Sequence, residues 1–210
     1  MLRHAALLIA LLLPTAVFAQ VEPGPPGPYV IDLHGAMLGV PNAGEFYPAL
    51  PTSGIIPGRA FGLDAGAHVL LGGPGSSRLG FGASVIVVRG RVGPPDVSAK
   101  LAAIAPQVSL NFGTGDGWSY LGVGYGVGQI STHVSTTPAA GVEDDAGTAL
   151  NPDVKTGTVG TLNAGGGARW FVTPHAAVGF DVRFYRFAAS SEHGTPATMR
   201  MALSVGVSLR

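Results

Sequence analysis

Four ionisable residues near the start of the chain form two closely spaced pairs, Asp32 with His34 and Asp64 with His68. In an extended chain, residues two or four positions apart lie on the same face. Carboxylates and imidazoles gathered in this way either bind a metal ion or form a hydrogen-bond network with arginines. Their spacing matches no recognised pattern of metal ligands, so we expect a structural network and no metal. Charged residues from later in the chain are expected to complete it: Asp181, Arg183 and Arg200.

A histidine and a serine two residues apart, His133 and Ser135, form a second candidate site. An imidazole within reach of a hydroxyl can activate it as a nucleophile, and Glu143 is the carboxylate that would orient the imidazole. The interpretation we favour is that two polar residues open a loop. The nearby segment VEDDAG (142–147) and Asp153 bring together carboxylates of the kind that bind Ca²⁺, but a solvated acidic loop is the expectation. No phosphate-binding glycine spacing is present, and no cofactor is expected.

The overall charge is balanced, with 12 Lys and Arg against 12 Asp and Glu, and charged residues make up only 11% of the 210 residues. A chain of this kind has no strong positive field, so nucleic acid is not an expected partner. The 33 glycines and 17 prolines are typical of a chain with many turns and close backbone contacts. The length suits one domain.

The first 19 residues, MLRHAALLIALLLPTAVFA, have the features of a secretory signal peptide. Arg3 gives a positive start, residues 5–13 are apolar, and cleavage is expected after Ala19. The apolar run is too short to cross a bilayer as a helix. A proline-rich lead-in follows at 20–28, and the mature domain is expected to cover 29–210.

Eight stretches of this domain alternate between apolar residues and small or polar ones, which is the period-two pattern of a β-strand. In the closing stretch, TMRMALSVGVSL, Met, Leu and Val occupy the odd positions. The predicted strands are 29–39, 59–71, 78–89, 102–112, 119–130, 158–172, 176–187 and 198–210. The connections alternate between short turns and longer loops, and both ends of the domain fall on the short-turn side. This arrangement predicts an all-β fold, an eight-stranded antiparallel up-and-down barrel.

The second face of the strands decides between a soluble and a transmembrane barrel. Sheets that face water usually rely on Lys, Glu and Thr, but neither Lys nor Glu falls within the eight predicted stretches. The second face instead carries Gly, Ser, Asn and a few charges of both signs, which suits a narrow interior. We therefore predict a transmembrane barrel with its apolar face toward lipid. On this basis arginine should be poorly tolerated at outward Val123, whereas serine should be accepted at inward Gly124.

With its signal peptide, eight amphipathic strands, short turns and long loops, the chain resembles the small outer-membrane barrels of the OmpA, OmpX and opacity-protein type. The segments YLGVGYGVG (120–128) and ARWFVTPHAAVGFDVRFYRF (168–187) are similar to that superfamily. The resemblance implies location in the outer membrane of a Gram-negative-type bacterium and insertion by the outer-membrane assembly machinery. Such barrels usually end in an aromatic residue, whereas this chain ends in Leu209-Arg210.

Three arginines are predicted to lie on the lipid-facing side at the extracellular rim: Arg59, Arg89 and Arg186. Because the planar guanidinium suits bidentate pairing with phosphate, we expect them to contact lipopolysaccharide phosphates. The alternative is that they simply extend toward water. An aromatic girdle is expected at the periplasmic end from Tyr29, Phe112 and Trp170.

These features favour a non-enzymatic outer-membrane scaffold that makes its interactions, whether adhesive, with a partner or with lipopolysaccharide, through surface loops. One alternative is a lipid-modifying hydrolase, because His133 and Ser135 weakly resemble the His-x-Ser of outer-membrane lipid A deacylases. The other is a narrow porin-like channel for very small solutes, although eight-stranded barrels are usually filled by their own side chains. The sequence does not identify an extracellular partner.

Overall fold

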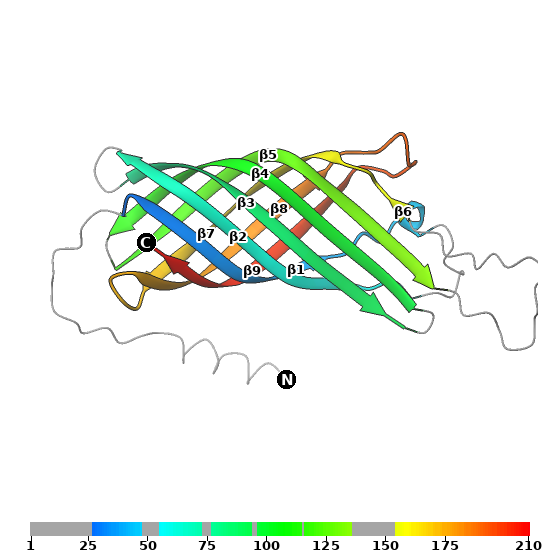
Figure 1. The fold of residues 1–210 in the computed structure, drawn as a ribbon, viewed down its shortest axis with the longest axis horizontal. Coiled ribbons are helices and arrows are strands. Elements are labelled where there is room, and N and C mark those ends of the chain that lie inside the picture. Colours follow the sequence, from blue (N-terminus) through cyan, green and yellow to red (C-terminus); the bar gives the residue numbers. More distant parts are fainter. Residues whose placement is uncertain (1–26, 48–54, 73–76, 94–95, 115, 136–153) are drawn as a thin grey trace, which may run out of the picture.

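The computed structural model describes residues 27–47, 55–72, 77–93, 96–114, 116–135 and 154–210. Eight long strands wind around one barrel (Figure 1). They are β1 (Tyr29–Gly39), β2 (Arg59–Gly72), β3 (Ser77–Val92), β4 (Asp96–Thr114), β5 (Gly117–Ser135), β7 (Val159–Phe171), β8 (Ala176–Phe187) and β9 (Thr198–Leu209). Two short elements, η1 (Gly44–Phe46) and β6 (Val154–Lys155), are added at one end. The predicted signal peptide (1–19) and most of the lead-in lie outside the described residues.

Every long strand pairs antiparallel with its two neighbours, and the pairing of β1 with β9 and of β4 with β5 closes the sheet into a barrel. Leu33, for example, lies opposite Val207 of the last strand. The start of β1 and the end of β9 lie at the same end of the barrel, together with the connections β2–β3, β4–β5 and β7–β8 (Figure 1). The predicted eight-stranded up-and-down topology is confirmed. Short turns mark the periplasmic end of such barrels and longer loops the extracellular end.

Strands β3, β4 and β5 extend further at the extracellular end than the sequence pattern indicates. β4 begins at Asp96 instead of residue 102, so the connection from β3 is reduced to residues 93–95. The prediction of a long loop between these two strands is therefore wrong. The inward Val97 and Leu101 are fully buried, whereas the outward Lys100 is exposed. The expectation that lysine is absent from the strands is also wrong, because β4 contains Lys100 and β6 contains Lys155. Both lie at the extracellular end of the barrel.

Side-chain exposure alternates along the strands as the sequence predicts. In β9 the outward Met199 and Val205 are 64% and 61% exposed, whereas the inward Ser204 and Ser208 are buried. Large apolar side chains are exposed on the outside of all eight long strands, while carboxylates and guanidiniums lie inside. An apolar exterior around a charged interior requires lipid as the surrounding solvent, so the barrel is a transmembrane one. No helix among the described residues has the length and apolar character needed to cross a membrane.

The extracellular half of the interior is apolar, which the expectation of a small and polar second face did not anticipate. Ile86, Leu101 and Ile130 pack there with other buried aliphatic residues. The segment 40–47, which we call the luminal plug, adds Phe46 and Tyr47 to this cluster. The Thr132 hydroxyl donates a hydrogen bond to the Phe46 carbonyl. Burial raises the pKa of the Tyr47 phenol, which favours its neutral form inside the barrel.

Aromatic residues fill the periplasmic end of the interior. Trp118 and Phe171 pack with their ring centroids 4.7 Å apart beside the buried Val30. The C-terminal Arg210 places its guanidinium 3.8 Å from the Phe171 ring centroid and donates a hydrogen bond to the Pro174 carbonyl. The last residue therefore covers the periplasmic mouth, and the interior is packed at both ends as well as in the middle.

Candidate functional site: the polar lumen and the basic rim

A buried ion pair crosses the middle of the lumen from β7 to β1. Arg169 donates from Nε and Nη2 to the two carboxylate oxygens of Asp32 at 2.8 and 2.6 Å. The Ser208 hydroxyl donates to the same carboxylate at 2.6 Å. Arg169 is only 2% exposed, and its guanidinium lies 3.9 Å from the Tyr120 ring centroid. Paired in this bidentate way, both charges are tolerated in an interior that excludes bulk water.

A second group of polar residues is centred on Asp181 and Arg183 of β8. Arg183 donates from Nε and Nη2 to the Asp181 carboxylate at 3.2 and 3.0 Å, and the Tyr120 hydroxyl donates to it at 2.8 Å. The remaining Arg183 nitrogen, Nη1, donates to the Asn163 side-chain oxygen at 2.9 Å. The group thus joins three adjacent strands, β5, β7 and β8.

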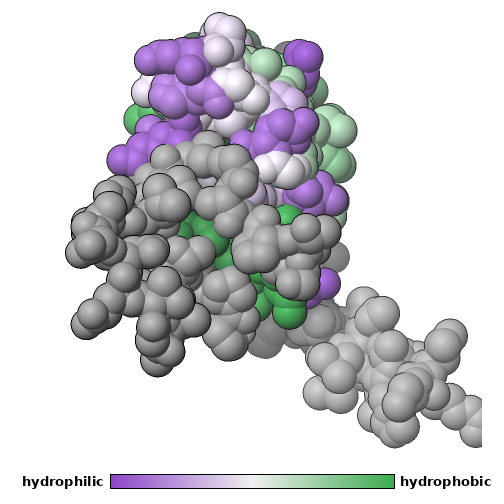
Figure 2. All heavy atoms as spheres, turned by 90° about the vertical axis from the view of Figure 1, so that its right-hand side faces the viewer, coloured by the Kyte–Doolittle hydropathy of each residue, from purple (hydrophilic) through white to green (hydrophobic). Residues whose placement is uncertain are grey.

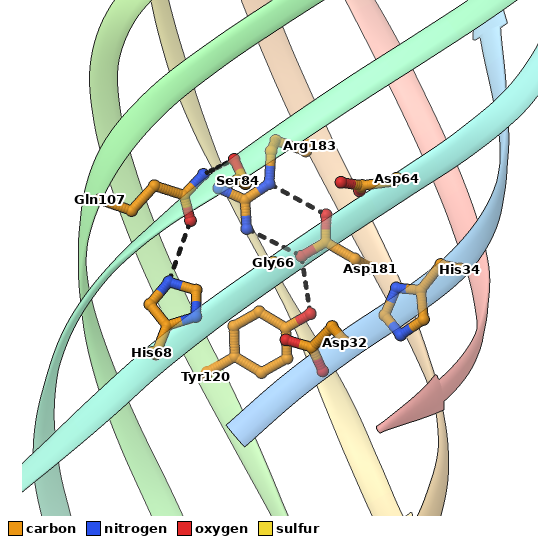
Figure 3. Close-up of a pocket in the computed structure, with 10 residues that line it drawn as sticks. All are labelled: Asp32, His34, Asp64, Gly66, His68, Ser84, Gln107, Tyr120, Asp181 and Arg183. Atoms are coloured by element: carbon orange, nitrogen blue, oxygen red, sulfur yellow. Dashed lines mark hydrogen bonds and ion pairs between the residues drawn. The ribbon is translucent and has the colours of Figure 1, made fainter. Parts of the chain in front are cut away.

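Gln107 of β4 extends this network to the opposite wall (Figure 3). Its amide nitrogen donates to the Asn163 oxygen at 2.9 Å and to the Ser84 hydroxyl, and its amide oxygen lies 3.2 Å from His68 Nε2. Hydrogen bonds therefore run from His68 through Gln107, Asn163 and Arg183 to Asp181 and Tyr120. A network with members on six strands holds the wall together and fills the space that a channel would need.

Six of the predicted network residues line one small cavity of about 20 Å³: Asp32, His34, Asp64, His68, Asp181 and Arg183. Such a volume has room for about one water molecule. Asp64 accepts a hydrogen bond from the Ser204 hydroxyl at 3.2 Å. Arg200 lies apart from this cavity, near the extracellular end of β9, where its Nε donates to the Thr198 hydroxyl at 2.9 Å.

Four important members of the network were not among the residues predicted for it: Arg169, Tyr120, Gln107 and Asn163. All four have inward parity on their strands, so the alternation alone would have placed them in the lumen. The alternation does not show which inward residues lie at the same depth in the barrel, because their depth depends on the register between strands that are distant in sequence. Asp32 and Arg169, for instance, are 137 residues apart.

The catalytic and metal-binding alternatives gain little from the geometry. Within the described part of the chain, no group of three or more His, Asp or Glu side chains is placed to hold a metal ion. His133 and Ser135 both fall at the extracellular end of β5, where His133 lies opposite Ser98 of β4. Glu143, the segment 142–147 and Asp153 lie outside the described residues.

The three rim arginines are exposed on the outward face at the extracellular end, but they do not lie together. Arg59 and Arg89 are on the adjacent strands β2 and β3. Arg186 is on β8, which is four strands from β3 in either direction around the barrel. Its cross-strand neighbours are Leu162 and Met199, both apolar and exposed. Hydrophilic residues gather over much of the described surface at this end (Figure 2).

Aromatic side chains ring the outside of the barrel at the periplasmic end. Tyr29, Phe112 and Trp170 are exposed there, and Trp170 stacks on Phe180 with their ring centroids 5.8 Å apart. Aromatic residues prefer the boundary between lipid and water, so these positions mark the periplasmic edge of the membrane-spanning part of the barrel.

Known proteins match this chain in fold, whereas the searches with its sequence found no match. No protein-family model and no curated protein match the chain. The solved structure of Neisserial surface protein A aligns with a TM-score of 0.54 at 14% identity, covering 87% of this chain and 97% of that one. Ail, the attachment invasion locus protein of Yersinia pestis, in complex with the heparin analogue sucrose octasulfate, aligns with a TM-score of 0.52 at 10% identity, covering 86% and 96%. The chain has the fold of the small outer-membrane barrels.

Proposed function

We propose that the protein is a non-enzymatic outer-membrane barrel, exported through its N-terminal signal peptide and inserted by the outer-membrane assembly machinery, that acts as a scaffold for contacts at the extracellular surface. The observation that carries this proposal is a lumen filled along its length inside an apolar exterior. A barrel built in this way offers partners its outer rim and its loops.

The packing of the interior argues against a channel. An ion or solute entering from outside meets the luminal plug and the aliphatic cluster first. Below these lie the Arg169–Asp32 pair and the Gln107 network, and the Trp118–Phe171–Arg210 cap closes the far end. Passage would require three separate layers to rearrange.

Lipopolysaccharide is the partner we propose for the rim. Arg59, Arg89 and Arg186 are exposed on the outward face at the extracellular end. Charges on the lipid-facing side are tolerated only near the membrane edge, where lipid phosphates are also found. Because Arg89 and Arg186 are on opposite walls, they would contact different lipid molecules. If the proposal holds, lipopolysaccharide will stabilise the wild type in detergent more than it stabilises the triple Arg→Gln variant. Equal stabilisation would contradict it.

Location and fold are tested together by expressing the full chain in a Gram-negative host. We expect the protein in the outer-membrane fraction, dependent on detergent for extraction, with migration in gels that changes on heating. Recovery of a folded, water-soluble monomer would contradict the proposal. The hydrolase alternative is tested by comparing lipid hydrolysis by wild type and His133→Ala, which we expect to be equally absent.

A further inference from the structure

A shallow groove of about 320 Å³ is cut into the lipid-facing wall where β9, β1 and β2 meet. Its lining includes Gly35 and the outward side chains of Met37, Phe61, Leu203 and Val205. The groove exists because Gly35 has no side chain between its cross-strand neighbours Leu63 and Val205. A Cβ added at Gly35 would meet only the Val205 carbonyl oxygen, at 3.8 Å, so the position is open toward lipid.

One row of cross-strand neighbours leads from this groove to basic side chains. Leu203 lies opposite Met37, and Met37 lies opposite Phe61. Phe61 is opposite Arg89, which is opposite Lys100. Since neighbouring strands are about 4.8 Å apart, Lys100 is about 10 Å from Phe61. Within this row, the outward side chains are therefore apolar on β9, β1 and β2 and basic on β3 and β4.

The groove and the basic residues correspond in depth to the acyl chains and the phosphate of a membrane lipid. Arg59 lies two residues above Phe61 on β2, or about 7 Å along the strand, and four residues above Leu63, or about 14 Å. With the usual strand tilt, the groove extends about 10 Å below Arg59, into the outer half of a hydrocarbon core about 30 Å thick. Arg59 stands above the groove, and Arg89 and Lys100 lie beside it in the row of Phe61. All three are exposed.

We propose that this groove and the basic residues beside it form a binding site for one phosphorylated, acylated lipid of the outer leaflet. An acyl chain lies in the groove over Gly35, and the phosphate is held by Arg59, Arg89 and Lys100. The site rests on the proposed function, because it assumes a barrel in the outer membrane, and it deepens that function by placing a specific lipid on one wall.

Two features favour a lipid as the ligand and this wall of the barrel as its binding site. The groove is lined by apolar residues, so a soluble sugar phosphate or sulfated polysaccharide would use only the basic half. Arg186, on the opposite wall, has exposed Leu162 and Met199 as its cross-strand neighbours. Arg186 therefore has apolar cross-strand neighbours on both sides, whereas Arg89 lies opposite Lys100.

The test is the binding of purified bisphosphorylated lipid A to the full mature protein in detergent, with native mass spectrometry to count bound lipids and a titration to obtain Kd. One tightly held lipid is expected on the wild type. Gly35→Leu fills the groove, and Arg89→Gln with Lys100→Gln removes the phosphate contacts. Each of these variants should raise Kd by at least about tenfold. Ala83→Leu, which adds an apolar side chain elsewhere on the outward face, should leave Kd unchanged.

The outcomes separate this site from the broader rim proposal. If Gly35→Leu binds lipid A as the wild type does while the Arg89/Lys100 variant is weakened, the acyl groove is overturned and the rim proposal stands. If neither variant is weakened, both fail. If sucrose octasulfate, which has no acyl chain, competes for the Arg89/Lys100 residues as strongly as lipid A binds, the partner is a soluble polyanion and the lipid site is overturned. Unchanged heat-modifiable migration will show that the variants fold.

Discussion

Replacing Arg169 by methionine should strongly destabilise the barrel, because it would leave the Asp32 carboxylate buried without its cation. The wild-type pair has two charge-assisted hydrogen bonds, at 2.8 and 2.6 Å, and Arg169 is 2% exposed. Removing one partner of a buried ion pair typically costs about 3–5 kcal/mol. The loss of the guanidinium from the Tyr120 ring, 3.9 Å away, acts in the same direction. We expect the free energy of unfolding to fall by about 4 kcal/mol.

Urea unfolding in detergent micelles, followed by tryptophan fluorescence, measures this loss directly. Trp118 reports on the site, since its ring centroid lies 5.9 Å from the Arg169 guanidinium. The double variant Arg169→Met with Asp32→Leu should regain about 2 kcal/mol or more, because no unpaired charge remains in it. The exposed Arg186→Met is the matched control and should change stability by no more than about 0.5 kcal/mol.

The comparison of the single and double variants tests the physical reasoning. If the double variant is no more stable than Arg169→Met, the loss comes from packing and the unpaired carboxylate does not explain it. If Arg169→Met costs no more than Arg186→Met, the buried pair contributes nothing measurable to the stability of the barrel.

Three further outcomes are expected. Arginine at outward Val123 should cost about 2–4 kcal/mol in unfolding measurements, whereas Gly122→Ala, whose added Cβ meets nothing closer than 3.6 Å, should change stability by about 1 kcal/mol at most. Gly124→Ser should be clearly destabilising in the same assay, contrary to the sequence-based expectation, because its Cβ would lie 2.6 Å from the Pro106 carbonyl oxygen. Phe46→Ala should lower stability by about 3 kcal/mol, yet planar bilayers containing the variant should show no conductance, since two deeper layers of the lumen stay filled.

Strand number, topology and the direction of each side chain could be predicted because the signal for them is local. Alternation with a period of two needs only the strand itself, and the structure places Val205 outside and Ser204 inside as the pattern indicates. Strand ends could not be predicted equally well. Residues 96–101 have small and polar outward positions that are typical of a loop, but Val97 and Leu101 are fixed in the barrel by packing against residues such as Ile130.

Which residues face lipid and which face the lumen follows from parity along each strand, so it can be inferred from the order of residues alone. Which of these residues contact one another depends on the closed barrel. Arg169 reaches Asp32, Phe46 enters the extracellular mouth, and Phe61 stands beside Arg89 because closing the sheet fixes the register between distant strands. A shift of register by two residues keeps every side chain on its face but changes all of its cross-strand partners. Alternation along a strand therefore carries no information about register, and register is what creates the network, the plug and the groove.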